Sequence, residues 1–146
     1  MILEPVIILA NGNYPKHSVP IEKINQAGSI ICCDGALDKM IESGKEPYVI
    51  IGDLDSIDSN LKAKYKDRII HFPDQNENDL RKAIRWAEDK GIKEVAILGS
   101  TGKREDHSIA NIFILLQFPT SLNCTLITDH GVFTVVEGTT EFTSFK

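Results

Sequence analysis

The sequence of 146 residues has the length of one domain, and its 42% hydrophobic and 25% charged residues are ordinary for a folded protein. This composition argues against disorder and against a fibrous repeat. Sixteen Lys and Arg against 21 Asp and Glu give a net charge of −5, which argues against nucleic acid as the main partner because binding to a phosphate backbone needs a surplus of cations.

Short apolar runs recur from the start of the chain, and each is soon followed by Gly or Asp. They cover residues 6–10, 29–33, 48–51, 69–72 and 95–98. Because the apolar residues are continuous and do not alternate with polar ones, the runs predict strands covered on both faces. That is typical of a parallel sheet flanked by helices.

The clearest helical pattern covers residues 79–90, where apolar residues recur at helical spacing. Asn78 is suited to cap this helix, Asp79 lies in its positive first turn, and Gly91 follows its end. Trp86 lies off the apolar stripe, so we expect it to be partly exposed or to form an oligomer contact.

A further helix is predicted after Asp106. Its residues 109–116 are apolar nearly all round, which indicates burial on most sides. Two shorter helices are expected over residues 36–43 and 59–66. Strands alternating with helices predict an α/β fold of three layers, α/β/α, with a mostly parallel sheet.

The pattern changes after residue 120, where residues 124–128 and 132–136 predict two strands joined by a turn. We expect residues 1–120 to form the α/β domain and residues 121–146 to begin a β-sandwich domain that the chain does not complete.

The three cysteines do not suggest a disulfide framework, because their number is odd and two of them are adjacent. We expect Cys32, Cys33 and Cys124 to be reduced and buried in strands of a cytoplasmic protein. No apolar run is long enough to cross a bilayer, and the segment after Met1 lacks the order of a signal peptide.

Ligands of open α/β sheets bind beyond the carboxyl ends of the strands. The segments that follow the five apolar runs are rich in Gly, Asn and carboxylates: Asn11-Gly12, Asp34-Gly35, residues 52–56, 73–79 and 99–107. Any one of them is equally well a solvated turn. Five at one edge of one sheet indicate a binding site.

Asp53 and Asp55 are the sharpest local feature. In an extended chain, two carboxylates two residues apart point the same way and can share a cation such as Mg²⁺. Gly52 allows a close backbone approach, and Ser56 can cap the next turn. Asp79 could add a third carboxylate or simply face the helix dipole, and an Asp-rich turn without a metal is the structural alternative.

Residues 99–107 have the features of a phosphate-binding loop. Glycines and small hydroxyl residues expose backbone N–H groups, Lys103 and Arg104 add positive charge, and a helix begins next. The loop is not a Walker A motif, because Ile97 and Arg104 occupy positions that require Gly and Ser or Thr. His107 either anchors the helix or acts as a base.

These segments, in order, resemble thiamine pyrophosphokinase, specifically its N-terminal catalytic domain. The matching motifs are Asp34-Gly35, GDLDS at 52–56, PDQNEND at 73–79 and GSTGKREDHSIAN at 99–111, and the resemblance covers residues 5–120. Lys103 stands where the family commonly has a second Gly, while Asn76 and Asn78 replace an Asp and a Thr.

The resemblance implies transfer of the diphosphoryl group of ATP to the hydroxyl group of thiamine, which leaves AMP. By carry-over, the residues that hold Mg²⁺ would be Asp53, Asp55 and Asp79. The phosphates would meet Arg104, Lys103 and the backbone of Gly99, Ser100, Thr101 and Gly102. The reacting end and thiamine would face Gln75 and Asp106. The nucleotide site would be lined by Asn11, Asp34, Gly35, Ser56 and His107. We expect Asp106 to orient, and to deprotonate, the thiamine hydroxyl.

Members of the family usually carry a C-terminal β-sandwich, form homodimers and build the thiamine pocket partly from that second domain. We therefore expect a homodimer for the full-length protein, and ATP·Mg binding with little thiamine turnover for this chain.

Two other functions fit the same residues. In a phosphatase of the haloacid-dehalogenase type, Asp53 would be an aspartyl nucleophile, although that motif normally follows the first strand. A module that senses nucleotide or metal without catalysis is the other alternative.

Overall fold

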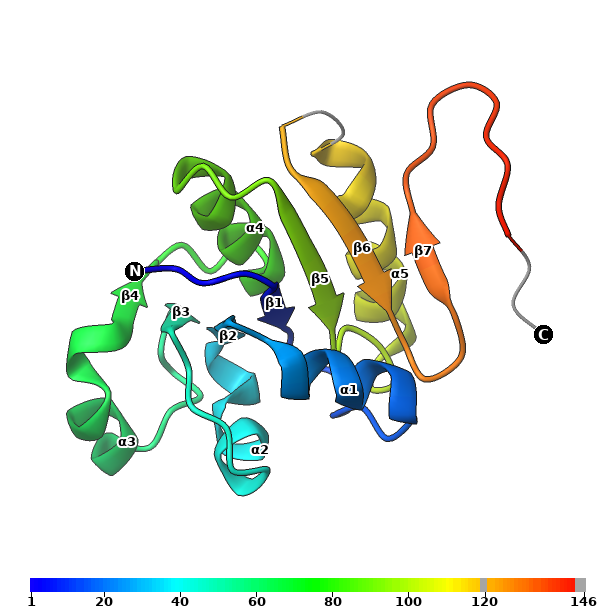
Figure 1. The fold of residues 1–146 in the computed structure, drawn as a ribbon. Helices are drawn as coiled ribbons and strands as arrows, with labels where there is room; N and C mark the ends of the chain where they lie inside the picture. The colour runs from blue at the N-terminus through cyan, green and yellow to red at the C-terminus, as the bar shows by residue number, and fades with distance from the viewer. Residues whose placement is uncertain (119–120, 144–146) are drawn as a thin grey trace.

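The computed structural model describes residues 1–118 and 121–143, and its centre is a sheet in the strand order β4-β3-β2-β1-β5-β6-β7 (Figure 1). The strands are β1 Val6–Leu9, β2 Ser29–Cys33, β3 Val49–Gly52, β4 Ile69–His71, β5 Glu94–Leu98, β6 Asn123–Ile127 and β7 Val132–Thr134. Strands β1 to β6 are parallel, and β7 runs antiparallel to β6. The predicted, mostly parallel sheet is confirmed.

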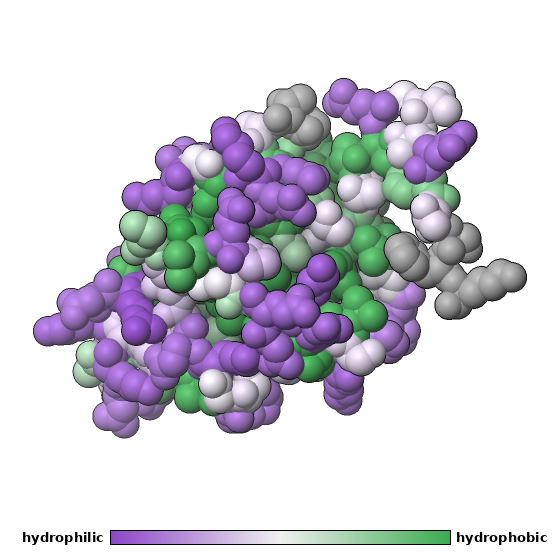
Figure 2. Space-filling view, viewed as in Figure 1, coloured by the Kyte–Doolittle hydropathy of each residue, from purple (hydrophilic) through white to green (hydrophobic). Residues whose placement is uncertain are grey.

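Helices cover both faces of the sheet. The helices are α1 Ser18–Gln26, α2 Leu37–Glu42, α3 Ser59–Lys64, α4 Asp79–Asp89 and α5 Glu105–Phe113. On one face, Ile24 of α1 and Met40 of α2 share a buried cluster with the odd-numbered residues of β1, and Leu61 of α3 packs against that cluster. On the other face, α4 packs over the even-numbered residues. The three-layer α/β/α prediction is therefore confirmed, and largely hydrophilic residues face solvent in Figure 2.

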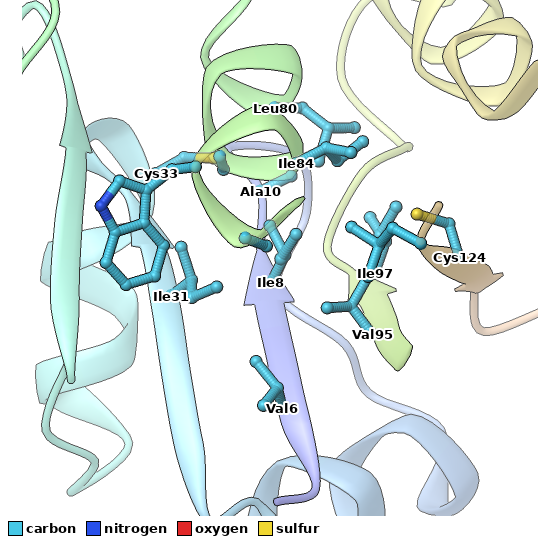
Figure 3. Close-up of a cluster of buried hydrophobic side chains, with 14 of the residues drawn as sticks. Val6, Ile8, Ala10, Ile31, Cys33, Leu80, Ile84, Val95, Ile97 and Cys124 are labelled. Atoms are coloured by element: carbon cyan, nitrogen blue, oxygen red, sulfur yellow. The ribbon is translucent and has the colours of Figure 1, made fainter. Parts of the chain in front are cut away.

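The packing of α4 on the sheet explains the continuous apolar runs. Figure 3 shows Leu80 and Ile84 of α4 above Ile8 of β1, within one cluster of buried side chains. Ile7 and Leu9 of the same strand are buried in the cluster on the opposite face. Because both faces are covered, every residue of β1, β2 and β3 is buried, and neither face of these strands can be polar.

The strand order places β1 and β5 side by side although they are far apart in sequence. From β1 the chain builds β2, β3 and β4 in one direction, and it then returns to place β5 and β6 on the other side. At such a reversal the two connecting loops leave in opposite directions, so a crevice opens beyond the carboxyl ends of the two strands.

Two helices differ from expectation here. Helix α1 was not predicted, because its sequence has no broad apolar stripe, and in the structure Pro20 and Ile24 are its buried residues. Trp86 is 8% exposed and belongs to the core, because α4 buries a wider face than its aliphatic stripe and the Trp86 ring lies beside that of Tyr48.

Helix α5 is not buried on most sides, contrary to its composition. Its residues Ile109 and Phe113 are 56% and 61% exposed, because only the opposite side of this segment faces the sheet. Residues of β7 and the segment after it add to this apolar surface, and Figure 2 shows hydrophobic residues reaching the surface around β7.

The C-terminal strands continue the main sheet. Strand β6 pairs with β5, and β7 pairs with β6. The domain boundary expected after residue 120 falls outside the described residues. Within the described part of the chain the three cysteines are free and buried, as expected, and no helix there is long and apolar enough to span a membrane.

Candidate functional site

A cavity of about 480 Å³ lies at the carboxyl ends of the strands, where β1 and β5 meet. Nine of the predicted site residues line it: Asn11, Asp53, Gln75, Asp79, Ser100, Thr101, Lys103, Arg104 and His107. The other seven do not line it: Asp34, Gly35, Asp55, Ser56, Gly99, Gly102 and Asp106. The structure thus brings together side chains from the loops after β1, β3, β4 and β5.

The loops after β1 and β5 are joined through their backbones. The N–H of Asn13 donates to the carbonyl of Thr101 over 2.8 Å, and the N–H of Gly12 donates to the carbonyl of Gly99. A Cβ atom on Gly12 would lie 2.5 Å from both carbonyl oxygens, of Gly99 and Thr101. Glycine at this position is therefore what allows the two loops to meet at one wall of the cavity.

The aspartate-rich loop after β3 is bent and not extended. Leu54, between the two aspartates, has a φ of 69°, a conformation that is strained for a residue with a side chain. The carboxylate of Asp34 holds it there by accepting the Leu54 N–H over 2.8 Å. The expected extended geometry is therefore wrong: Asp53 lines the cavity, and Asp55 does not. The next helix, α3, is capped by Asp58.

Asp34 supports this loop from behind. Its side chain is buried at 3% exposure, and the pKa of its carboxyl is raised to about 6 by burial and then by the neighbouring charges of Asp79 and Asp53, while N–H groups of Leu54 and Gly35 oppose the shift. A buried carboxylate near two other carboxylates is a pattern of functional sites. Asp34 itself is not among the residues that line the cavity.

Asp79 reaches the cavity from the N-terminus of α4. Asn78 caps this helix as predicted, with its side chain accepting the Leu80 N–H over 2.7 Å. Lys82, three residues on, donates to the Asp79 carboxylate over 2.9 Å and lines the same cavity. Sequence reasoning missed Lys82, although the i, i+3 spacing from Asp79 on a helix could have indicated the pair.

Asp53, Asp55 and Asp79 do not form a ready-made three-carboxylate centre. Within residues 1–118 and 121–143, no three Asp, Glu, His or Cys side chains are close enough to hold a metal ion. Asp53 and Asp79 nevertheless line one cavity, and both charges act on Asp34. Asp55 instead accepts a hydrogen bond from Gln75 over 3.2 Å. One or two carboxylates suit Mg²⁺ when phosphates complete its shell.

The loop after β5 contributes two cationic residues, Lys103 and Arg104, to the lining of the cavity. Ser100 is 3% exposed, and its Oγ has no hydrogen-bond partner among the described residues. Lys103 donates to the Asn11 side chain over 3.0 Å. Buried hydroxyl groups are normally paired, so the unpartnered Ser100 hydroxyl beside the cavity indicates room for an acceptor from a ligand.

Arg104 is held at the start of α5 by a forked ion pair. Its Nε and Nη2 donate to the two carboxylate oxygens of Asp106 over 3.1 and 2.6 Å. This hydrogen bonding is the main cause of the lowered pKa of Asp106 and the raised pKa of Arg104. Both side chains are well exposed. Arg104 lines the cavity and Asp106 stands outside it.

Comparison with known proteins identifies the family. A family model described as "Thiamin pyrophosphokinase, catalytic domain" matches residues 21–127, most of the chain. This chain belongs to the thiamin pyrophosphokinase catalytic domain family. The resemblance of the four motifs is thereby confirmed, and the phosphatase and binding-module alternatives are not favoured.

Solved structures of thiamin pyrophosphokinases have the same fold. A probable thiamine pyrophosphokinase from Staphylococcus saprophyticus is 29% identical with a TM-score of 0.64, over 85% of this chain and 65% of that one. A protein from Lactobacillus plantarum is 30% identical with a TM-score of 0.64, over 85% and 61% of the two chains. The enzyme from Bacillus subtilis is 23% identical with a TM-score of 0.68, over 84% and 59%, and shows likeness of fold.

The chain therefore covers less than two thirds of the length of each of these three solved structures. Among curated protein sequences, none matches the chain at a significant level.

Proposed function

We propose that this chain binds ATP with Mg²⁺ in the cavity and is the nucleotide-binding part of a thiamin pyrophosphokinase. In that reaction the hydroxyl oxygen of thiamine forms a bond to the β-phosphorus of ATP. The bond from this phosphorus to the oxygen that bridges the α- and β-phosphates breaks, AMP leaves with that oxygen, and the hydroxyl proton is released. Such transfers depend mainly on alignment and on neutralised phosphate charge.

The observation that carries this proposal is that carboxylates and cations from different loops line one cavity. Asp53 and Asp79 come from the loop after β3 and the start of α4, and Lys103 and Arg104 come from the loop after β5. Carboxylates and cations that share a cavity without pairing across it can bind a metal and an anion together. A nucleotide triphosphate with its divalent cation has this combination of charges.

The phosphates would be bound by the loop after β5. The N-terminus of α5 directly follows this loop and has no side-chain cap from Arg104, and a helix N-terminus favours anions. The hydroxyl group of Ser100 is free to donate, Lys103 supplies a point charge, and Arg104 a planar fork. The backbone from Gly99 to Gly102 would complete this phosphate site.

Asp53 and Asp79 would hold Mg²⁺ on the triphosphate, and Asp55, which does not line the cavity, would act indirectly by orienting Gln75 through their hydrogen bond. When bound, the ion would neutralise charge that develops on the phosphate oxygens. Gln75 would meet the reacting end of the nucleotide. The rest of the nucleotide would be held by Asn11 and His107 in the lining, with Asp34, Gly35 and Ser56 behind them.

Asp106 would position the reacting groups from the edge of the cavity. Because Arg104 lowers its pKa, the carboxylate is ionised at neutral pH and is a weak base. Orientation of Arg104 and of the thiamine hydroxyl therefore fits Asp106 better than proton abstraction does.

The exposed apolar surface on α5 and β7 supports a homodimer of the full-length protein. Phe113, Val132, Phe133 and Phe142 are all exposed, and residues of this surface line a groove of about 470 Å³. Monomeric proteins rarely expose such a patch.

We also propose that residues 121–146 lead towards a β domain that completes the thiamine pocket. We further propose that the three free thiols reflect a cytoplasmic location.

The experiment measures ATP binding by calorimetry with and without Mg²⁺, and AMP release with and without thiamine. We expect Mg²⁺-dependent binding of ATP by this chain, with thiamine-dependent AMP release in a version as long as the solved family members. Absence of ATP binding would overturn the proposal that the cavity binds a nucleotide. AMP release that does not depend on thiamine would overturn the proposal that thiamine is the acceptor.

A further inference from the structure

The two sides of the cavity are joined by a chain of side-chain amides. The N–H of Leu80 donates to Asn78 Oδ1 over 2.7 Å, and Asn78 Nδ2 donates to Asn111 Oδ1 over 2.9 Å. Asn111 Nδ2 then donates to the carbonyl of Ser100 over 2.8 Å. The bonds connect α4 to α5 and to the loop after β5, across 33 residues of sequence between Asn78 and Asn111.

The direction of every bond in this relay is fixed by its two ends. A backbone N–H can only donate, so Asn78 must present its oxygen to Leu80 and its NH₂ group to Asn111. A backbone carbonyl can only accept, so Asn111 must present its NH₂ group to Ser100. Both amide orientations follow from chemistry, and neither amide can turn over without losing two bonds.

The relay ends on groups that face the ligand. Asn78 immediately precedes Asp79, the proposed Mg²⁺ ligand, and Asn111 holds Ser100, whose hydroxyl group is unpartnered within the described part of the chain. Asn111 is itself buried at 8% exposure and lines the cavity with Asn78. Because its carbonyl is occupied by Asn111, Ser100 is fixed while its hydroxyl group stays available.

We propose that Asn78 and Asn111 are positioning residues, which set the distance between the carboxylate of Asp79 and the phosphate-binding loop at Ser100. This inference rests on the proposed function. It assigns a role to Asn78 beyond the helix cap, and one to Asn111, for which the sequence suggested none. A metal-bound triphosphate touches both walls, so a shift of about 1 Å between them weakens its binding.

The test is a double-mutant cycle read by calorimetry of ATP·Mg binding. Asn111→Leu keeps a side chain of similar size but removes the hydrogen bonds to Asn78 and Ser100. Asn78→Ala removes the hydrogen bond to Asn111 together with the cap on the Leu80 N–H. We expect each single variant to raise the Kd about tenfold, and the double variant to raise it little more than the worse single one, because both remove the same bridge. Asn111→Ser, too short to reach both partners, replaces Asn111→Leu if that variant does not fold.

Asp58→Ala is the matched control. Asp58 caps α3 in the same way, accepting the Asn60 N–H over 2.8 Å, and it does not line the cavity. We expect this variant to lower the melting temperature about as much as Asn78→Ala and to leave the Kd unchanged.

The possible results separate the two proposals. If wild-type protein does not bind ATP·Mg, the proposed function fails and this inference fails with it. If the wild type binds but the Asn111 variant binds equally well, or the two single effects multiply to about a hundredfold in the double variant, only the positioning role is overturned.

Discussion

Lys82 Nζ lies 2.9 Å from Asp79 Oδ1, and the two side chains differ sharply in exposure, at 1% for the lysine and 30% for the aspartate. The ammonium group also donates to the carbonyl of Phe72 over 3.3 Å. The buried positive charge of Lys82 therefore depends on Asp79 for compensation, whereas the carboxylate of Asp79 is still partly in contact with solvent.

This asymmetry predicts unequal effects on stability. Asp79→Ala leaves a buried ammonium group unpaired and should lower the free energy of unfolding by about 3 kcal/mol, whereas Lys82→Met, of similar shape, should lower it by about 1 kcal/mol or less. Urea denaturation measures both. Lys39→Met, in an exposed pair with Glu42, is the control and should leave the free energy of unfolding nearly unchanged. A larger loss for Lys82→Met than for Asp79→Ala would contradict the prediction.

The positions of the two aspartates after β3 predict unequal roles in Mg²⁺ binding. Asp53 lines the cavity and Asp55 is reached through Gln75. Asp53→Asn should therefore raise the Mg²⁺ concentration needed for ATP binding at least about tenfold, and Asp55→Asn by a smaller factor. Titration of Mg²⁺ at fixed ATP measures this. Unchanged Mg²⁺ dependence in both variants would remove the metal assignment.

The raised pKa of Asp34 predicts how stability depends on pH. Between about pH 4 and the folded pKa of about 6, the folded state binds more protons at this site than the unfolded state, so the contribution to stability falls as pH rises and is constant above pH 6. In Asp34→Asn the amide oxygen can still accept the Leu54 N–H, and the substitution removes the titratable group and its pH-dependent contribution to stability. We expect the variant to exceed the wild type by about 2 kcal/mol at pH 7 and by much less at pH 4.

Urea denaturation from pH 4 to pH 7 checks the sign. Asp106 supplies the comparison, because its pKa is lowered by Arg104 and the stability it contributes is present above the unfolded pKa and lost as pH falls through the folded one. Asp106→Asn should therefore alter the pH profile in the opposite direction. A wild-type advantage over Asp34→Asn that grows as pH rises from 4 to 6 would show the assignment of the Asp34 shift to be wrong.

The forked pair of Arg104 and Asp106 predicts that geometry matters as well as charge. Arg104→Lys keeps the charge but loses the fork on Asp106, so ATP·Mg binding should weaken about tenfold. Asp106→Asn should reduce thiamine-dependent AMP release in the longer version by a similar factor or more. Near-normal turnover at saturating Mg²⁺ would refute a role for Asp106.

Much of the site could be read from residue types at strand ends. Asn11, Asp53, Asp79 and the loop at Ser100 were predicted because polar residues follow buried strands in a parallel sheet, and they do share one cavity. Lys82 and Asn111 were missed because lysine and asparagine on a helix are ordinary solvent-facing residues, and only the packing of α4 and α5 shows that both are buried.

The sequence by itself determined the alternation of strands and helices, since burial on both faces requires continuous apolar runs, and it determined which loops carry the polar groups. Only the tertiary structure decided that β5 inserts beside β1, that Asp53 lines the cavity whereas Asp55 does not, and that Trp86 is buried while Phe113 is exposed. Periodicity along a chain reports local geometry. Which faces meet depends on contacts between residues far apart in sequence, and these appear only when the sheet is assembled.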